Sequence, residues 1–311
     1  MNSTTPKGIS VVKAGPLALI QDGGRFGVRH LGVTQGGAAD WISHRWANWL
    51  LGNPLESAAL EIVVGGGLTL AVECPTRLAL VGADLDATLD DAPLAPGTSF
   101  TVSPGQRLVF HQPRAGLRAY LAFPGGLDAP EVLGSRACTT RERLGGLHDD
   151  GQPLKAGDRL TWQGKAPGER RLPEALAPCM PKSGCRLALV LGAQAGHFTG
   201  RSLYQAFNSA WQVDNRADRM GVRLLGPPLN CRLSGMISEG IPLGAVQVPA
   251  DGQPIVLLND RQTIGGYPRL GALTPIACAT LAQCLPGSEI HLQPVSATQA
   301  CEMHLALLNR F

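Results

Sequence analysis

Glycine and proline interrupt this chain so often that few long helices can form. Of its 311 residues, 39 are Gly and 24 are Pro. Both residue types weaken helix interiors and mark turns. The short apolar runs left between them are typical of β-strands. The sequence therefore predicts a mainly β fold with a few helices.

Apolar runs and capping residues indicate where the elements lie. Strand-like runs in the first half are 9–12, 17–20, 68–72, 78–81, 99–102, 108–111 and 120–123. Helices are predicted from Asp40, over 199–211, from Thr274, and from Ser296, which forms a Ser-x-x-Gln capping box. The glycines at 65–67 predict a hairpin turn.

Prolines and mixed charges gather between residues 164 and 182, which is typical of a linker. We predict an N-terminal β-barrel domain over 1–165 and a Pro-rich linker over 166–183. A second β-barrel domain is predicted over 184–295, followed by a C-terminal helix over 296–311.

Charge and hydropathy argue against several partners. The net charge is +3 and no long run of Lys or Arg occurs, so nucleic acid is not expected as a partner. No apolar stretch approaches the roughly 20 residues that span a bilayer, which predicts a soluble, cytoplasmic protein with no membrane partner. The 8 Cys and 7 His lack metal-ligand spacing, and no metal is predicted.

Polar side chains cluster at both ends of an apolar run at 255–258, which is predicted to be a buried strand. Gln247, Gln253, Asp260 and Gln262 flank it. A buried polar group without a partner costs about 1–3 kcal/mol, so these residues require a partner or a function. The alternative is that each satisfies neighbouring backbone groups.

A second polar segment near the N-terminus reveals a family resemblance. It runs Gln-Asp-Gly-Gly-Arg over 21–25, Gly-Gly-Ala-Ala-Asp over 36–40 and Gly-Asn-Pro over 52–54, and Asp-Arg-Met-Gly follows at 218–221. With the 253–267 block, these motifs resemble the carboxyltransferase family related to allophanate hydrolase subunit 2. That family includes the C subunit of bacterial ATP-dependent 5-oxoprolinase, the carboxyltransferase region of urea carboxylase, and an antikinase partner of a sporulation kinase.

The resemblance implies a fold, partners and a cofactor. It implies two cyclophilin-like β-barrel domains, a subunit-B-like partner, a separate hydrolase (the A subunit), and a small amide or lactam substrate. ATP use is implied for the complex. Because no Gly-x-x-x-x-Gly-Lys-Ser/Thr motif is present, we expect ATP to be shared with a partner. None of the lysines has the flanking sequence of a biotin acceptor, so no biotin is expected on this chain.

Side chains that could stabilise a developing oxyanion complete the predicted site. The predicted catalytic residues are Asp40, Gln253, Asp260 and Gln262, and the predicted substrate-binding residues are Arg25, Gln21, Gln247, Gly265, Gly266 and Tyr267. For Asp40 a structural alternative is evident, because an aspartate at this position can cap the following helix. Arg219 is interpreted as structural, paired with an aspartate at a turn.

Three functions remain open. The first is an ATP-hydrolysing 5-oxoprolinase component that opens the 5-oxoproline lactam to L-glutamate, as the length of the chain and the absence of biotin machinery suggest. The second is a carboxyltransferase component that acts on urea or a related amide with carboxybiotin from another protein. The third is a non-catalytic, antikinase-type regulatory partner.

Overall fold

The computed structural model describes residues 7–165, 167–233 and 236–311. The chain divides into two compact units. Unit 1 comprises the described residues up to Phe26 and residues 36–180, and unit 2 comprises residues 27–35 and 181–311. The segment 27–35, which lies within the predicted N-terminal domain, thus belongs to the second unit.

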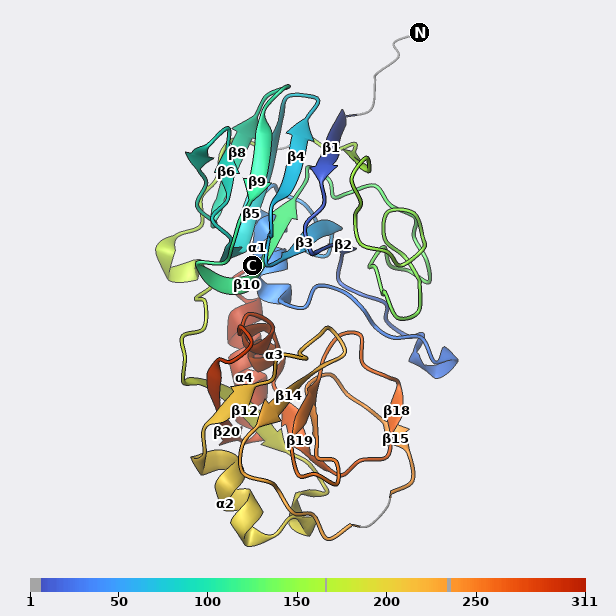
Figure 1. The fold of residues 1–311 in the computed structure, drawn as a ribbon, viewed down its shortest axis with the longest axis vertical. Helices are drawn as coiled ribbons and strands as arrows, with labels where there is room; N and C mark the ends of the chain where they lie inside the picture. The colour runs from blue at the N-terminus through green and yellow to red at the C-terminus, as the bar shows by residue number, and fades with distance from the viewer. Residues whose placement is uncertain (1–6, 166, 234–235) are drawn as a thin grey trace. The chain divides into compact units, whose positions relative to one another are not determined.

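Unit 1 is built from two sheets. The first has the strand order β11 (Arg159–Trp162), β1 (Lys7–Lys13), β4 (Leu68–Val72), β9 (Arg107–Phe110), β6 (Thr88–Leu89) and β7 (Ala92–Pro93). Several of its strands are labelled in Figure 1. The second has the order β2 (Leu17–Gln21), β3 (Ala59–Val63), β10 (Ala115–Ala122), β5 (Thr76–Asp84) and β8 (Thr98–Val102). The described neighbours in both sheets pair antiparallel, as in β1 with β4 and β10 with β5.

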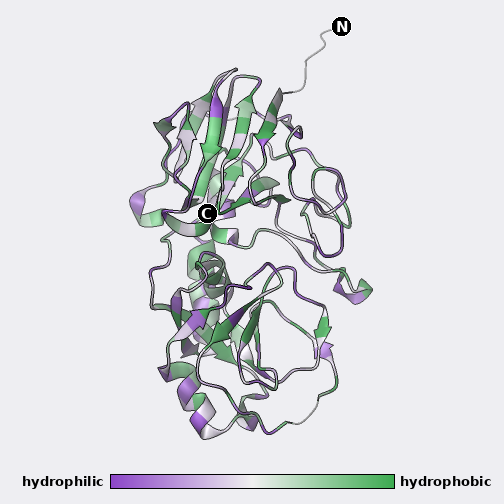
Figure 2. Ribbon diagram, in the orientation of Figure 1, coloured by the Kyte–Doolittle hydropathy of each residue, from purple (hydrophilic) through white to green (hydrophobic). Residues whose placement is uncertain are grey.

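One core joins these sheets. In β4, Leu68, Leu70 and Val72 are buried while the residues between them are partly exposed. They belong to the same apolar cluster as Ile20 of β2 and Leu80 of β5, which lie in the other sheet. Figure 2 shows hydrophobic residues, in green, along the strands of this unit. Burial in β4 therefore follows the period-2 pattern of a strand with one face toward the core, whereas β3 and β5 are buried over consecutive residues.

The glycines at 65–67 do not form the predicted hairpin turn. They connect β3 to β4, but these strands lie in different sheets, so the chain crosses from one sheet to the other. All three glycines have positive φ, of 73°, 61° and 85°. Consecutive positive φ values favour glycine because it lacks a Cβ.

Helix α1 (Trp41–Leu50) begins as predicted. The Asp40 side chain accepts hydrogen bonds from the backbone N–H groups of Ile42 and Ser43, both at 3.1 Å. Trp46 and Leu50 are buried on its apolar face. Asp40 therefore acts as the helix N-cap.

Unit 2 contains a closed barrel. Its strand order is β12 (Cys185–Leu191), β19 (Arg269–Leu273), β16 (Ala245–Gln247), β17 (Ile255–Leu257), β14 (Gly221–Leu225), β13 (Trp211–Val213) and β20 (Glu289–Val295). The parallel pairing of β12 with β20 closes it. A separate ladder joins β15 (Glu239–Gly240) to β18 (Ile264–Gly265) (Figure 1). The mainly β, barrel-type architecture predicted from the sequence is confirmed, with the closed barrel in unit 2.

Three longer helices accompany the barrel. They are α2 (Gly200–Asn208), α3 (Pro275–Ala282) and α4 (Ala297–Leu308). Thr274 caps α3, and Ser296 with Gln299 forms the predicted capping box of α4. The prediction that α2 extends to residue 211 is wrong, because Ser209 has an extended backbone and Trp211 begins β13. No helix among the described residues is both long and apolar enough to cross a membrane.

The predicted linker is partly packed against unit 1. The Arg170 carbonyl accepts a backbone hydrogen bond from Ser99, and Leu172 donates one to Gly97. These contacts continue the edge of β8, and Leu172 is buried. Residues 170–172 therefore form part of unit 1.

Candidate functional site

A buried ion pair follows β17 in unit 2. Arg219 Nε lies 2.9 Å from Asp260 Oδ2, and its Nη2 lies 3.0 Å from Asp260 Oδ1. The two side chains are only 6% and 3% exposed. Both carboxylate oxygens of Asp260 thus accept from one guanidinium, the two-pronged geometry that arginine favours. Asp260 is predicted to be catalytic, and in the structure its carboxylate pairs with Arg219.

The next residue, Arg261, is also buried and donates mainly to uncharged acceptors. Its Nε lies 3.1 Å from the Ile241 carbonyl oxygen, and its Nη1 lies 3.1 Å from that of Leu258. Its Nη2 makes a longer contact of 3.4 Å with Gln35 Oε1. Burial, together with the positive charge of Arg29, lowers the Arg261 pKa to about 10. A guanidinium this buried favours a nearby negative charge.

Arg29 supplies that neighbouring charge from a short 3-10 helix, η1 (Arg29–Leu31). Its Nη2 donates to the carbonyl oxygens of Ile241, Gln262 and Thr263 at 2.9, 3.3 and 3.1 Å. Its Nη1 is buried and has no hydrogen-bond partner among the described residues. Burial also lowers the Arg29 pKa. We call Arg29, Arg219, Arg261 and Asp260 the arginine cluster.

Gln247, a predicted binding residue, lies in β16 and is 2% exposed. Its Nε2 likewise has no hydrogen-bond partner in the described part of the chain. A Cβ built on Gly265 would lie 3.0 Å from this Nε2 and 2.6 Å from Ile241 Cδ1. Gln247 and Arg29 therefore both border the β15–β18 ladder.

Gln253 and Gln262 have different surroundings. The Gln253 side chain accepts from the backbone N–H of Gly226 at 2.9 Å and donates to its carbonyl at 3.0 Å. These two bonds hold the end of β14 beside the start of β17. Gln262 contacts Arg29 through its backbone carbonyl. Gln253 and Asp260 thus lie at opposite ends of β17, and no hydrogen bond between them is found among the described residues.

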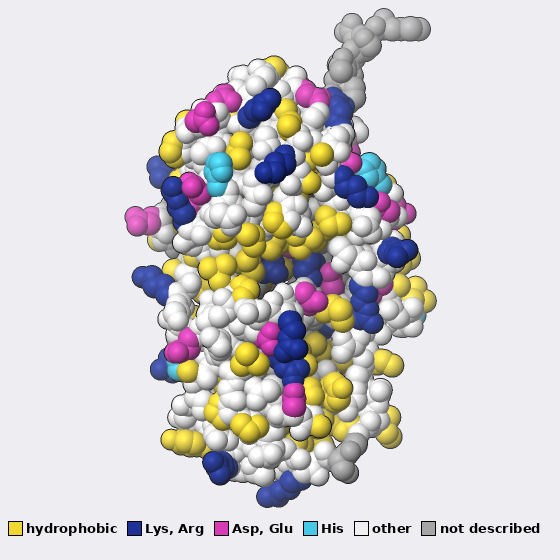
Figure 3. All heavy atoms as spheres, viewed as in Figure 1, with side chains coloured by type: hydrophobic (Ala, Val, Ile, Leu, Met, Phe, Trp, Pro, Cys, Tyr) yellow, Lys and Arg dark blue, Asp and Glu magenta, His cyan; other side chains and the backbone are white. Residues whose placement is uncertain are grey.

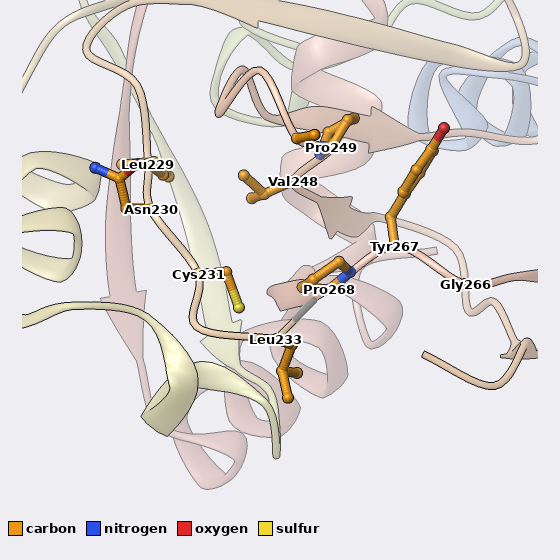
Figure 4. A pocket seen from close by; sticks show the side chains of 10 residues that line it. Leu229, Asn230, Cys231, Leu233, Val248, Pro249, Gly266, Tyr267 and Pro268 are labelled. Carbon is orange, nitrogen blue, oxygen red and sulfur yellow. The ribbon is translucent and has the colours of Figure 1, made fainter. Parts of the chain in front are cut away.

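A pocket of about 290 Å³ lies beside Gly266 and Tyr267. Figure 4 shows Leu229 and Cys231 on one segment facing Val248 on another. The Tyr267 ring is at the edge and is 53% exposed. Among the described residues that line this pocket, none has a charged side chain. Its apolar walls suit an uncharged or aromatic group.

The remaining predicted residues lie in unit 1 and hold its own backbone. Gln21 Nε2 donates to the Cys138 carbonyl at 2.8 Å. Arg25 donates to the carbonyls of Val132 and Ala137 at 3.0 and 2.6 Å. These contacts fix the loop at 132–138. Gln21, Arg25 and the helix cap Asp40 belong to unit 1, whereas the arginine cluster belongs to unit 2.

A second pocket, of about 270 Å³, lies in unit 1. Its charged lining residues are Asp22, Glu56, Glu131 and Arg136. Acidic groups outnumber basic ones here, whereas a triphosphate requires basic or amide donors. Neither this pocket nor the apolar one in unit 2 therefore fits the triphosphate of ATP.

Sequence reasoning missed Arg29 and Arg261. Arg261 lies directly between two predicted site residues, Asp260 and Gln262, and its position beside an apolar strand is the one signal that could have identified it. Arg29 has no such signal, because its partners lie more than 200 residues away in the chain. Figure 3 shows basic side chains dispersed among acidic ones on the displayed face.

The fold defines a mainly β protein with two compact units and a closed barrel, and comparison with known proteins identifies the family. The family model "Carboxyltransferase domain, subdomain A and B" matches residues 31–294. This chain belongs to that family.

Individual relatives support the same conclusion. Over 293 residues the chain is 39% identical to the C subunit of 5-oxoprolinase from Escherichia coli, covering 94% of this chain and 93% of that protein. It is 34% identical over 296 residues to the protein of the same name from Haemophilus influenzae, covering 95% and 94%. The crystal structure of K. lactis urea amidolyase superposes with a TM-score of 0.91 at 28% identity. That match covers 98% of this chain and 20% of the larger enzyme.

Proposed function

We propose that this protein is the C subunit of an ATP-dependent 5-oxoprolinase, which contributes to the activation and ring opening of 5-oxoproline to L-glutamate. The observation that carries the proposal is the end-to-end similarity to the Escherichia coli protein, with 94% of one chain and 93% of the other aligned. The same chain corresponds to only 20% of urea amidolyase.

The chemistry of lactam opening suits a positively charged site. Nucleophilic attack on the lactam carbonyl places negative charge on its oxygen, and phosphorylation of that oxygen attaches a negatively charged phosphoryl group to it. Fixed donors at that position lower the barrier, and loss of one typically costs about 2.7–4 kcal/mol. The arginine cluster adds positive charge to unit 2 that would favour an anionic substrate, because Arg29 and Arg261 contribute two guanidinium groups held by buried contacts. Their direct acceptors are carbonyl and amide oxygens.

ATP belongs to the complex in this proposal. Bound ATP would supply the phosphoryl group that activates the lactam carbonyl. We assign its binding to a site that another protein of the complex completes, because neither of the two pockets described above fits a triphosphate. The proposed partners are a subunit-B-like protein of the same family and a separate hydrolase, the A subunit.

Reconstitution tests the proposal. The three proteins together should convert 5-oxoproline to glutamate only when ATP is present, and omission of this chain should abolish the activity. The variant Arg216→Gln is a suitable control, since Arg216 is 74% exposed and pairs with Asp214, which is not a member of the cluster. Full turnover without this chain would show the proposal to be wrong.

A second candidate is a carboxyltransferase component that acts on urea or a related amide with carboxybiotin from another protein. The TM-score of 0.91 to urea amidolyase favours it. In this case, urea consumption should depend on a biotinylated carrier and should not require 5-oxoproline.

A further inference from the structure

Positive charge exceeds negative charge around Arg261. Arg261 interacts electrostatically with Arg29 and with Asp260, and the Asp260 carboxylate is already paired with Arg219. Both oxygens of that carboxylate accept from Arg219. Arg29 and Arg261 share the Ile241 carbonyl oxygen, which carries only a partial charge. Two like charges held this close are stabilised when an anion offsets them.

Two buried donors point to where such an anion would bind. Arg29 Nη1 and Gln247 Nε2 are buried, and neither has a hydrogen-bond partner among the described residues. Buried donors in folded proteins are almost always satisfied, so two unsatisfied donors beside one ladder call for an acceptor. Both side chains lie at the β15–β18 ladder. Arg29 donates to the carbonyl of Thr263, the residue before β18, and Gln247 Nε2 lies beside Gly265 within β18.

We propose that the arginine cluster binds the carboxylate of a small amide or lactam acid, with Arg29 Nη1 and Gln247 Nε2 as the donors. This inference rests on the proposed function and specifies which part of the substrate the cluster recognises. A carboxylate carries the charge that the cluster lacks and can accept from two donors at once. Arg261 donates to the carbonyl oxygens of Ile241 and Leu258 and so holds the Ile241 carbonyl that Arg29 also contacts.

A carboxylate-binding site would distinguish 5-oxoproline from urea. 5-Oxoproline carries a carboxylate beside its lactam, whereas urea has an amide carbonyl and no carboxylate. A site of this kind selects for the acid, because a neutral amide would leave the buried positive charge without a partner.

Calorimetric titration of the purified full chain tests the proposal. The ligands are L-5-oxoproline, 2-pyrrolidinone, which is the same lactam without the carboxylate, and inorganic phosphate. We expect 5-oxoproline to bind at least tenfold more tightly than 2-pyrrolidinone. Equal affinities, or no binding of 5-oxoproline, would overturn the proposal. Binding of phosphate alone would also overturn it, since it would identify a phosphate site instead.

Substitutions at Arg29 and Gln247 test whether these two side chains form the carboxylate-binding site. Arg29→Gln should reduce the affinity for 5-oxoproline at least tenfold while leaving that for 2-pyrrolidinone unchanged. Gln247→Glu should have the same effect, because it supplies an internal carboxylate. Arg216→Gln removes a positive charge elsewhere in unit 2 and should change neither. An equal effect of Arg29→Gln and Arg216→Gln would contradict the assignment. The comparison of ligands on the unmodified chain decides the question even if a variant fails to fold.

This result is distinguishable from a failure of the proposed function. If carboxylate binding depends on Arg29 but the reconstituted complex does not open 5-oxoproline, the function is wrong and the carboxylate site stands. If turnover occurs but Arg29→Gln leaves the affinity for 5-oxoproline unchanged, the site is wrong and the function stands.

Discussion

Arg29 and Arg261 donate to the same acceptor, the backbone carbonyl oxygen of Ile241, at 2.9 and 3.1 Å. The two residues are far apart in the chain, yet both belong to unit 2, because residues 27–35 pack there. The shared carbonyl joins the η1 segment to the end of the β15–β18 ladder. This contact makes the arginine cluster dependent on a segment from the N-terminal region of the sequence.

Removal of the Arg29 head group should loosen that segment. Arg29→Met retains an apolar stem but loses three hydrogen bonds to carbonyl oxygens. Hydrogen bonds that involve a charged group contribute about 1.5–3 kcal/mol each. We expect faster amide hydrogen exchange in peptides covering 27–35 and 239–241, measured by mass spectrometry. Arg216→Met is the control, and unchanged exchange in Arg29→Met would show that the segment is held by other contacts.

Asp260 and Arg219 should behave as a structural pair. Asp260→Asn leaves the buried Arg219 guanidinium without its carboxylate, and breaking a buried pair costs about 3–5 kcal/mol. Denaturant unfolding should show this loss. The control Asp251→Asn breaks the more exposed pair with Arg223 and should cost below about 1 kcal/mol. Normal stability with abolished turnover in Asp260→Asn would instead indicate the catalytic role predicted from sequence.

The fold could be predicted to a large extent because its signals are local. Alternating burial in β4, the Asp40 cap and the Ser296 capping box each depend on residues within a few positions of one another. A local sequence pattern does not identify the structure when two different connections between strands give the same pattern. The glycines at 65–67 indicate a turn but not whether the next strand remains in the same sheet.

The site could be predicted only in part. Gln247 and Asp260 are predicted from their position beside a buried strand; Asp260 belongs to the arginine cluster, and Gln247 borders the β15–β18 ladder. Arg29 could not be found in this way, because its carbonyl partners at 241, 262 and 263 are brought to it by tertiary structure. The sequence also does not indicate which backbone carbonyls will accept a hydrogen bond, because every residue has one.

Cys278 should be unreactive in the folded protein. It is 2% exposed in α3, and burial raises its pKa to about 12. Because the thiolate is the reactive form, a thiol reagent at mildly alkaline pH should label the exposed Cys179 and Cys301 first. Mass spectrometry of labelled peptides measures the order. Labelling of Cys278 at the rate of Cys301 before unfolding would show that α3 opens in solution.

Tyr120 should make the stability of the protein sensitive to alkaline pH. Its hydroxyl donates to Glu61 Oε2 at 2.7 Å and accepts from the Asp40 backbone N–H at 2.8 Å. Burial, with the negative charges of Glu61 and Asp40, raises its pKa well above 10.0. The folded state therefore keeps the proton that the unfolded chain releases, so this contribution to stability is complete below pH 10.0 and declines as pH rises above it.

Replacement of this tyrosine provides the test. Tyr120→Phe should lose about 1–3 kcal/mol of unfolding free energy near neutral pH, because two buried hydrogen bonds are removed. It should also reduce the alkaline decline, which denaturant unfolding at a series of pH values would measure. Tyr204→Phe makes the same change at a side chain that is 69% exposed and should alter neither quantity. If the two variants respond alike, the buried hydroxyl does not stabilise the junction between α1 and β10, and the Asp40 cap alone positions the helix.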